Sequence, residues 1–167
     1  MRKDLSQQLL RELLENSKRS DRDLAKALKV SQPTITRTRH KLEKNRMIQD
    51  YTIIPNFREM GFEILALTFV KMRSEILTPE VFEEAKKYCE KWPNVIFVSS
   101  GEGLGMTGVI LSFHQDYTDY HHRLNLLRVD WKELTEDIQS FIVSLKEGEF
   151  KRFSLTYLKD VPLKPRS

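Results

Sequence analysis

The first 45 residues alternate apolar and polar positions in the way that short amphipathic helices do. Leucines recur three and four positions apart between residues 4 and 16, which predicts a first helix with one buried face. Ser20, with Asp23 three positions later, predicts the start of a second helix, because its side chain can cap free backbone N–H groups. Ser31 predicts a third helix in the same way, with Pro33 in its first turn, where a missing N–H costs little.

The third predicted helix has two chemically different faces. Ile35 and Leu42 mark its buried side when successive residues are placed about 100° apart. The remaining surface is basic and rich in hydrogen-bonding groups, and Arg37 stands near its centre. The positions that we assign to a DNA-facing surface are Ser31, Gln32, Thr34, Thr36, Arg37, His40, Lys41 and Lys44.

Residues 47–54 are rich in β-forming side chains and stop at Pro55, which predicts a strand at the end of the helical segment. Together with the three helices, this strand would complete a winged helix-turn-helix domain over residues 1–50. We expect a hinge over residues 51–62 and a second domain over residues 63–160.

Beyond residue 62 the pattern changes to one of alternating strands and helices. Residues 63–73 are apolar on both faces, so both sides of this strand need a cover. Phe82, Ala85, Tyr88, Cys89 and Trp92 form the inner stripe of a predicted helix that starts at Thr78. A second helix has its stripe at Tyr117, Tyr120, Leu124, Leu127 and Trp131. Further strands are predicted at 95–100, 106–114, 138–145 and 150–158, the last two joined as a hairpin near Glu147 and Gly148.

The order βαββαβ, with one extra strand, predicts an α+β fold: a ferredoxin-like sheet that carries its helices on one face. The other apolar face would then need a second subunit. The tail from Val161 to Ser167 is expected to fray.

Composition narrows the class of protein. The chain has 167 residues, of which 40% are hydrophobic, so it can bury a core, and no stretch is long and apolar enough to span a bilayer. We therefore expect a cytoplasmic protein. Cys89 is the single cysteine, and its expected role is that of a buried small hydrophobe.

Charge separates the two predicted domains. Residues 1–50 hold 13 Lys and Arg against 7 Asp and Glu, whereas residues 51–167 hold 15 against 17. A basic helix face can simply be exposed to solvent. Here a second capped helix precedes the third one, and residues 1–50 as a whole are basic, so we favour double-stranded DNA as the partner. Glutamine and arginine suit base edges, and Lys41 and Lys44 suit backbone phosphates.

The run Asp-Leu-Ala-Lys-Ala-Leu-Lys-Val-Ser-Gln-Pro-Thr-Ile-Thr-Arg from Asp23 to Arg37, with Leu42-Glu43 and Ile48-Gln-Asp-Tyr-Thr after it, resembles the Lrp/AsnC (feast/famine) regulators of bacteria and archaea. The resemblance implies a sequence-specific transcriptional regulator that dimerises through its C-terminal sheets, often assembling further into octamers.

The resemblance also implies an effector, commonly an amino acid, near the loop between the second and third strands. That loop holds Gly101, Glu102, Gly103 and Gly105 here. The chain departs from the family pattern in two places. The acidic residue that commonly follows this loop is missing, and on the third predicted helix, the recognition helix of the family, Arg39 replaces a branched apolar residue. The loop glycines also have a second explanation, a tight turn with positive φ.

Two other functions remain open. Some siroheme decarboxylases resemble the same family, and the candidates for such chemistry are His114, His121, His122 and Glu102. His121 and His122 are sequence neighbours that point to different faces, and no third ligand has metal spacing, so we expect no enzyme, no metal site and no cofactor. An architectural, nucleoid-organising role would use the same DNA-binding helix with low sequence specificity.

Overall fold

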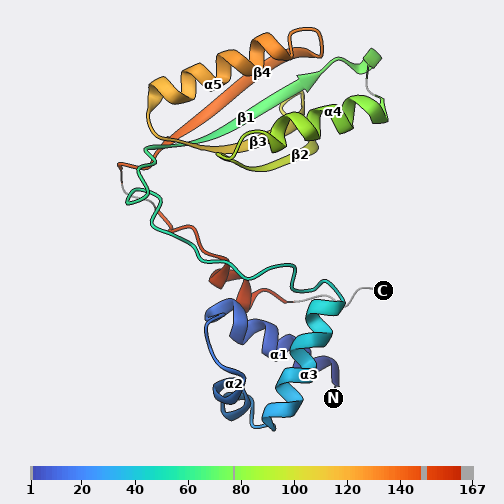
Figure 1. Cartoon of the computed structure of the whole chain (residues 1–167), viewed down its shortest axis with the longest axis vertical. Coiled ribbons are helices and arrows are strands. Elements are labelled where there is room, and N and C mark those ends of the chain that lie inside the picture. The colour runs from blue at the N-terminus through green and yellow to red at the C-terminus, as the bar shows by residue number, and fades with distance from the viewer. Residues whose placement is uncertain (1, 77, 148–149, 163–167) are drawn as a thin grey trace. The chain divides into compact units, whose positions relative to one another are not determined.

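The computed structural model describes residues 2–76, 78–147 and 150–162 (Figure 1). These residues form two compact units. The first contains residues 2–54 and 151–162, and the second contains the described residues between 55 and 150. Within these ranges, no helix has the length and apolar character that a membrane crossing requires.

Three helices build the first unit: α1 (Arg2–Glu15), α2 (Asp21–Leu28) and α3 (Gln32–Lys44). Leu9, Leu24 and Ile35, one from each helix, are fully buried together at the centre of the unit. Both predicted caps are confirmed, since Ser20 Oγ accepts from the N–H of Asp23 and Ser31 Oγ accepts from the N–H of Thr34.

Two predicted strands are wrong. Residues 47–54 contain no strand, so the helix-turn-helix has no wing in the described part of the chain. The described residues of 150–158 also contain no strand, and Gly148 of the predicted hairpin lies outside the described residues. Both segments have β-forming side chains, but a strand also needs a neighbouring backbone to pair with, and composition does not supply one.

The C-terminal segment belongs with helices α1 to α3 and not with the sheet, which corrects the domain end that we placed at residue 160. It forms a 3-10 helix, η2 (Leu155–Asp160), that packs on α1. Thr156 Oγ1 donates to the backbone oxygen of Leu14 over 3.1 Å, and Lys159 pairs with Glu15 at 3.3 Å. Residues 151–162 therefore complete the first unit.

The second unit is a four-stranded sheet with helices, and its βαββαβ order is confirmed (Figure 1). Its strands are β1 (Ile64–Met72), β2 (Val95–Gly103), β3 (Met106–His114) and β4 (Thr135–Ser144), arranged β2-β3-β1-β4 with antiparallel neighbours. A short η1 (Ser74–Ile76) and α4 (Pro79–Glu90) follow β1, and α5 (Tyr117–Asp130) follows β3.

Both helices pack on the same face of this sheet. Ile64, Ala66 and Val70 of β1 are buried against Cys89 of α4 and Leu124 of α5. Burial raises the pKa of the Cys89 thiol, which fits the predicted role of a small hydrophobe.

Phe82 and Tyr117 were expected in the buried stripes but are 49% and 59% exposed. Each stands in the first turn of its helix. Helical periodicity gives the direction of a side chain, but not whether the sheet extends beneath that turn.

The face of the sheet away from α4 and α5, here the outer face, is apolar. The strand register aligns Phe97, Leu111, Leu67 and Phe141 in one row across all four strands, here the outer-face row. Phe97 is 53% exposed and Phe141 is 65% exposed, and no described segment covers them.

One end of the outer face is closed by the chain itself. Phe57 stacks on Phe113 with the ring centroids 4.3 Å apart, and Phe62 contacts the same ring at 5.5 Å. Phe113 is consequently buried, whereas the outer-face row stays open. The open row is an apolar surface of the kind that marks an interaction site.

Candidate nucleic-acid interface

The turn between α2 and α3 is short and tightly bonded. Lys29 ends α2 in the left-handed conformation, with φ at 55°, and the N–H of Val30 donates to the oxygen of Ala25 over 3.0 Å. This is the bonding pattern of a helix that stops abruptly. Ser31 then caps α3, so the two helices are joined by three residues, as a helix-turn-helix requires.

Most of the predicted DNA-facing residues lie at the surface of α3. Gln32, Arg37, His40, Lys41 and Lys44 are all exposed. His40 contacts Glu43 through Nδ1 at 3.2 Å, so its ring is partly engaged within the helix. The exposed arginine and lysines leave this side of α3 cationic.

The hydroxyl groups at the start of α3 are used within the helix. Ser31 Oγ and Thr34 Oγ1 are 2.8 Å apart, and Ser31 Oγ also accepts the capping N–H. Their exposed or half-buried side chains lie at the amino end of α3, where the helix dipole favours a phosphate.

Thr36 and Arg39 point toward α2 and meet at Asp21. Thr36 Oγ1 donates to Asp21 Oδ2 over 2.7 Å, and Arg39 Nε donates to Asp21 Oδ1 over 2.8 Å. Thr36, which we placed on the DNA-facing surface, is therefore a residue that fixes α3 to α2. Helical periodicity could not reveal this role, because the partner is 15 residues away in the sequence.

Arg39 also reaches the segment that follows α3. Its Nη1 donates to the hydroxyl of Tyr51 over 3.2 Å, and that hydroxyl donates to Glu43 over 2.9 Å. The Arg39 side chain is only 17% exposed, and its charged head is paired with Asp21. The sequence analysis missed three residues of the network that holds α3 in place: Asp21, Glu43 and Tyr51.

The contacts with Thr36 and Arg39 favour the charged form of Asp21. Partial burial alone would raise the pKa of Asp21, but the hydrogen bond from Thr36 and the Arg39 guanidinium together hold this pKa below its usual value. Asp21 consequently stays ionised, and the orientation of α3 on α2 depends on a charge-assisted contact.

We expect Asp21→Ala to lower the free energy of unfolding of the first unit by about 1–3 kcal/mol, because it leaves the Arg39 guanidinium without its carboxylate. Since the pKa of Asp21 is depressed in the folded protein, the native contribution is present at neutral pH and is lost as the pH falls below about 4.

The measurement is urea unfolding of the full chain. Both tryptophans lie in the second unit, so circular dichroism at 222 nm should detect a transition that shifts while the tryptophan fluorescence transition stays in place. A double-mutant cycle with Arg39→Ala gives the coupling energy directly, and a value near zero would reject the bridge.

The predicted effector loop is the connection between β2 and β3. β2 extends to Gly103, which pairs with Met106, so Leu104 and Gly105 form a two-residue turn. Both have positive φ, 54° and 71°, as in the turn type that hairpins favour. Gly101 and Glu102 are exposed positions within the strand. The positive φ that this turn requires is enough to explain a glycine at position 105, without a bound effector.

Leu104 is a poor residue for its own position, since it is 84% exposed and holds a left-handed conformation that costs a side chain with a Cβ atom. We expect Leu104→Asn to raise the free energy of unfolding of the second unit by about 0.5–1 kcal/mol, because Asn-Gly suits this turn. Urea unfolding followed by tryptophan fluorescence measures the change. A loss of stability would instead indicate that the leucine side chain is used in a contact.

The residues considered for catalysis do not come together. His114 is buried beneath α5, whereas His121, His122 and Glu102 are exposed. Among the described residues, no three His, Cys, Asp or Glu side chains are grouped so that they could hold a metal ion.

Comparison with known proteins agrees with this geometry. Residues 4–43 match the family model of the AsnC-type helix-turn-helix domain. The uncharacterized HTH-type transcriptional regulator PF1734 of Pyrococcus furiosus is 35% identical over 72 residues, 43% of this chain, and the chain spans about half (49%) of that relative. PH0061 of Pyrococcus horikoshii, named in the same way, is 28% identical over 143 residues, which are 85% of this chain and 83% of the relative.

The fold is shared with solved regulators. A transcriptional regulator of Neisseria meningitidis, NMB0573, solved as an L-Met complex, superposes with a TM-score of 0.75 at 20% identity over 89% of this chain and 91% of its own. The chain thus resembles transcriptional regulators in its helix-turn-helix sequence and in its fold. Residues 4–43 form a helix-turn-helix of the AsnC type, and the predicted resemblance to Lrp/AsnC regulators is confirmed.

Proposed function

We propose that the chain binds double-stranded DNA sequence-specifically through α3, as a homo-oligomer, and is not an enzyme. The observation that carries this proposal is the exposed basic side of α3, with Arg37 at its centre, on a helix fixed at its start by the Ser31 cap and along its length by the Asp21–Arg39 pair. A fixed, cationic helix of this kind can enter the major groove, which admits one α-helix.

We assign base reading to Gln32 and Arg37, and phosphate contact to Lys41 and Lys44. Ser31 and Thr34 are placed at the first backbone phosphates met by the amino end of α3. His40 stays in the proposed surface, where its exposed ring is within reach of a base or a phosphate. Thr36 acts indirectly, through its bond to Asp21.

The oligomer is proposed to form by pairing of outer faces. The outer-face row offers four large apolar side chains, and a two-fold axis would bring the row of one subunit onto that of another. Two subunits would present two copies of α3 to two half-sites, and octamers would follow from further contacts between dimers.

A small molecule such as an amino acid is proposed to modulate the regulator at the loop of Gly101, Glu102, Gly103 and Gly105. The Neisseria relative is solved as an L-Met complex, and the exposed Leu104 in this loop is an apolar side chain without a cover in the described chain.

A genomic binding map, with footprinting of the strongest sites in vitro, tests this function. A cytoplasmic sequence-specific regulator should protect short, defined half-sites that share a motif. Long irregular protected tracts would favour a nucleoid organiser, and negligible DNA affinity together with turnover of siroheme would favour the enzyme. Thermal stabilisation by individual amino acids tests the effector, since a ligand that prefers the folded state must raise its stability.

A further inference from the structure

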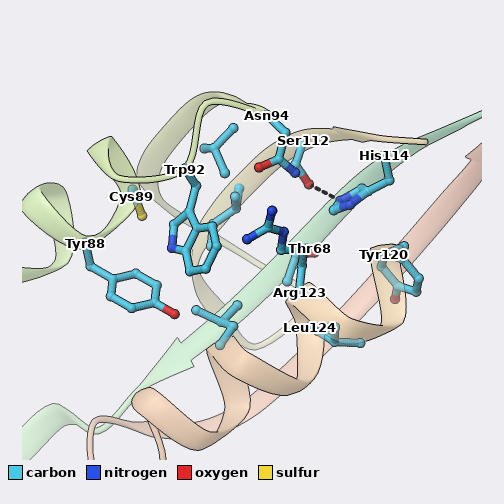
Figure 2. A pocket seen from close by; sticks show the side chains of 13 residues that line it. Thr68, Tyr88, Cys89, Trp92, Asn94, Ser112, His114, Tyr120, Arg123 and Leu124 are labelled. Carbon is cyan, nitrogen blue, oxygen red and sulfur yellow. Dashed lines mark hydrogen bonds between the residues drawn. The ribbon is translucent and has the colours of Figure 1, made fainter. Parts of the chain in front are cut away.

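The second unit contains a small cavity between α4, α5 and the inner face of the sheet (Figure 2). Its volume is about 50 Å³, and its lining changes in character from one end to the other. Asn94, Ser112 and His114 lie at one end and Tyr88 and Cys89 at the other, with the head of Arg123 between them. The cavity is thus lined by polar groups at one end and by apolar ones at the other.

The Arg123 side chain lines this cavity, and one of its N–H donors, at Nε, forms no hydrogen bond. Its Nε is buried and is the only such side-chain atom of the described residues that forms no hydrogen bond. Asp119 Oδ1 lies 3.5 Å from Nε, close enough for an ion pair, and the guanidinium carbon lies 4.4 Å from the centre of the Trp92 ring. A buried N–H of a charged group is costly to leave unpaired, so a hydrogen-bond acceptor close to Arg123 would stabilise this region.

The groups beside Arg123 can add to that acceptor site. Asn94 donates one amide N–H to the backbone oxygen of Phe113 over 3.0 Å, and its amide has a second N–H. His114 is 4% exposed and is held by Ser112 at 2.9 Å and Asp119 at 3.2 Å. The Asp119 carboxylate is shared, because its Oδ2 contacts His114 and its Oδ1 faces Arg123.

We propose that this cavity binds a short-chain carboxylate of the size of acetate or propionate. The carboxylate would accept from the head of the Arg123 guanidinium and from Asn94 Nδ2, and the alkyl group would lie against Leu127 and Cys89. The size follows from the volume, because each water-sized position needs about 10–15 Å³, which leaves room for about three to five non-hydrogen atoms. The site lies within one subunit, apart from the loop at residues 101–105, and does not depend on DNA binding.

Isothermal titration of the full chain with sodium acetate and sodium propionate, against sodium chloride at equal ionic strength, tests the proposal. One site per chain is expected, with a Kd of about 0.1–10 mM, as befits so small a ligand. Arg123→Gln should weaken binding by at least about tenfold, since it removes the charged donor. Arg123→Lys keeps the charge but loses the planar donor, and should weaken binding as well.

Arg128→Gln is the matched control, because it removes the same charge from an exposed position of the same helix. It should leave the Kd unchanged. Absence of saturable heat with either acid, or equal affinity in the wild type and in a folded Arg123 variant, would overturn the proposal. DNA affinity measured on the same samples keeps the two proposals separate, because carboxylate binding without DNA binding would count only against the regulator function.

Discussion

Replacing Phe141 by Glu is expected to convert the proposed oligomer into monomers. Phe141 ends the outer-face row and is 65% exposed in the single chain, so a second subunit would bury it. A symmetric interface would have to bury two introduced carboxylates, each at a cost of about 2 kcal/mol or more, which raises the dimer Kd by about 1,000-fold. Light scattering after size-exclusion chromatography measures the change in mass.

Operator affinity should fall with the oligomer. A monomer presents one α3 and loses the gain from binding two half-sites at once, which is about 100-fold or more. Val129→Glu is the control, since Val129 is an equally apolar, 72% exposed residue on α5, the helix that lies on the other face of the sheet. A folded Phe141→Glu protein with the wild-type mass would show that the outer face is not the interface.

Arg37→Ala is expected to weaken binding to the operator by about 1–3 kcal/mol, or roughly 5- to 150-fold, and to relax specificity at the base pair that Arg37 reads. The reason is geometric, because Arg37 is exposed near the middle of α3 and can reach a guanine edge with two donors. Fluorescence anisotropy with the operator and with a scrambled duplex of equal length measures both effects.

Lys44→Ala serves as the comparison for Arg37. Lys44 lies in the last turn of α3, so its removal should weaken binding to both duplexes by similar factors and reduce the dependence of affinity on salt. Unchanged operator affinity in Arg37→Ala would refute the assignment of Arg37 to a base. A uniform loss on both duplexes would move it to the phosphate contacts.

The helices could be predicted because their signals are local. Ser20, Ser31 and Thr78 each cap the helix that they precede, and a cap needs only the next three residues to form. The four strands of the sheet could be predicted for a related reason, since their alternation of side chains follows from the two faces that each strand presents.

The errors arose where the outcome depended on distant parts of the chain. Residues 150–158 have the composition of a strand, but η2 lies on α1, more than a hundred residues earlier in the sequence. Thr36 and Arg39 were interpreted from α3 alone, although their partner is Asp21 of α2. The orphan donor of Arg123 depends on a cavity between α4, α5 and the sheet, and no sequence pattern reports a cavity.

The return of residues 151–162 to α1 makes the sheet unit an insertion within the DNA-binding unit. Exchanging the DNA-binding specificity of this regulator for that of a relative would therefore need two junctions, near residues 54 and 151, and a chimera joined only after residue 54 would pair a foreign α1 with the native η2. Recombination at a single point should accordingly yield poorly folded proteins, and the two segments of the first unit are expected to be inherited together.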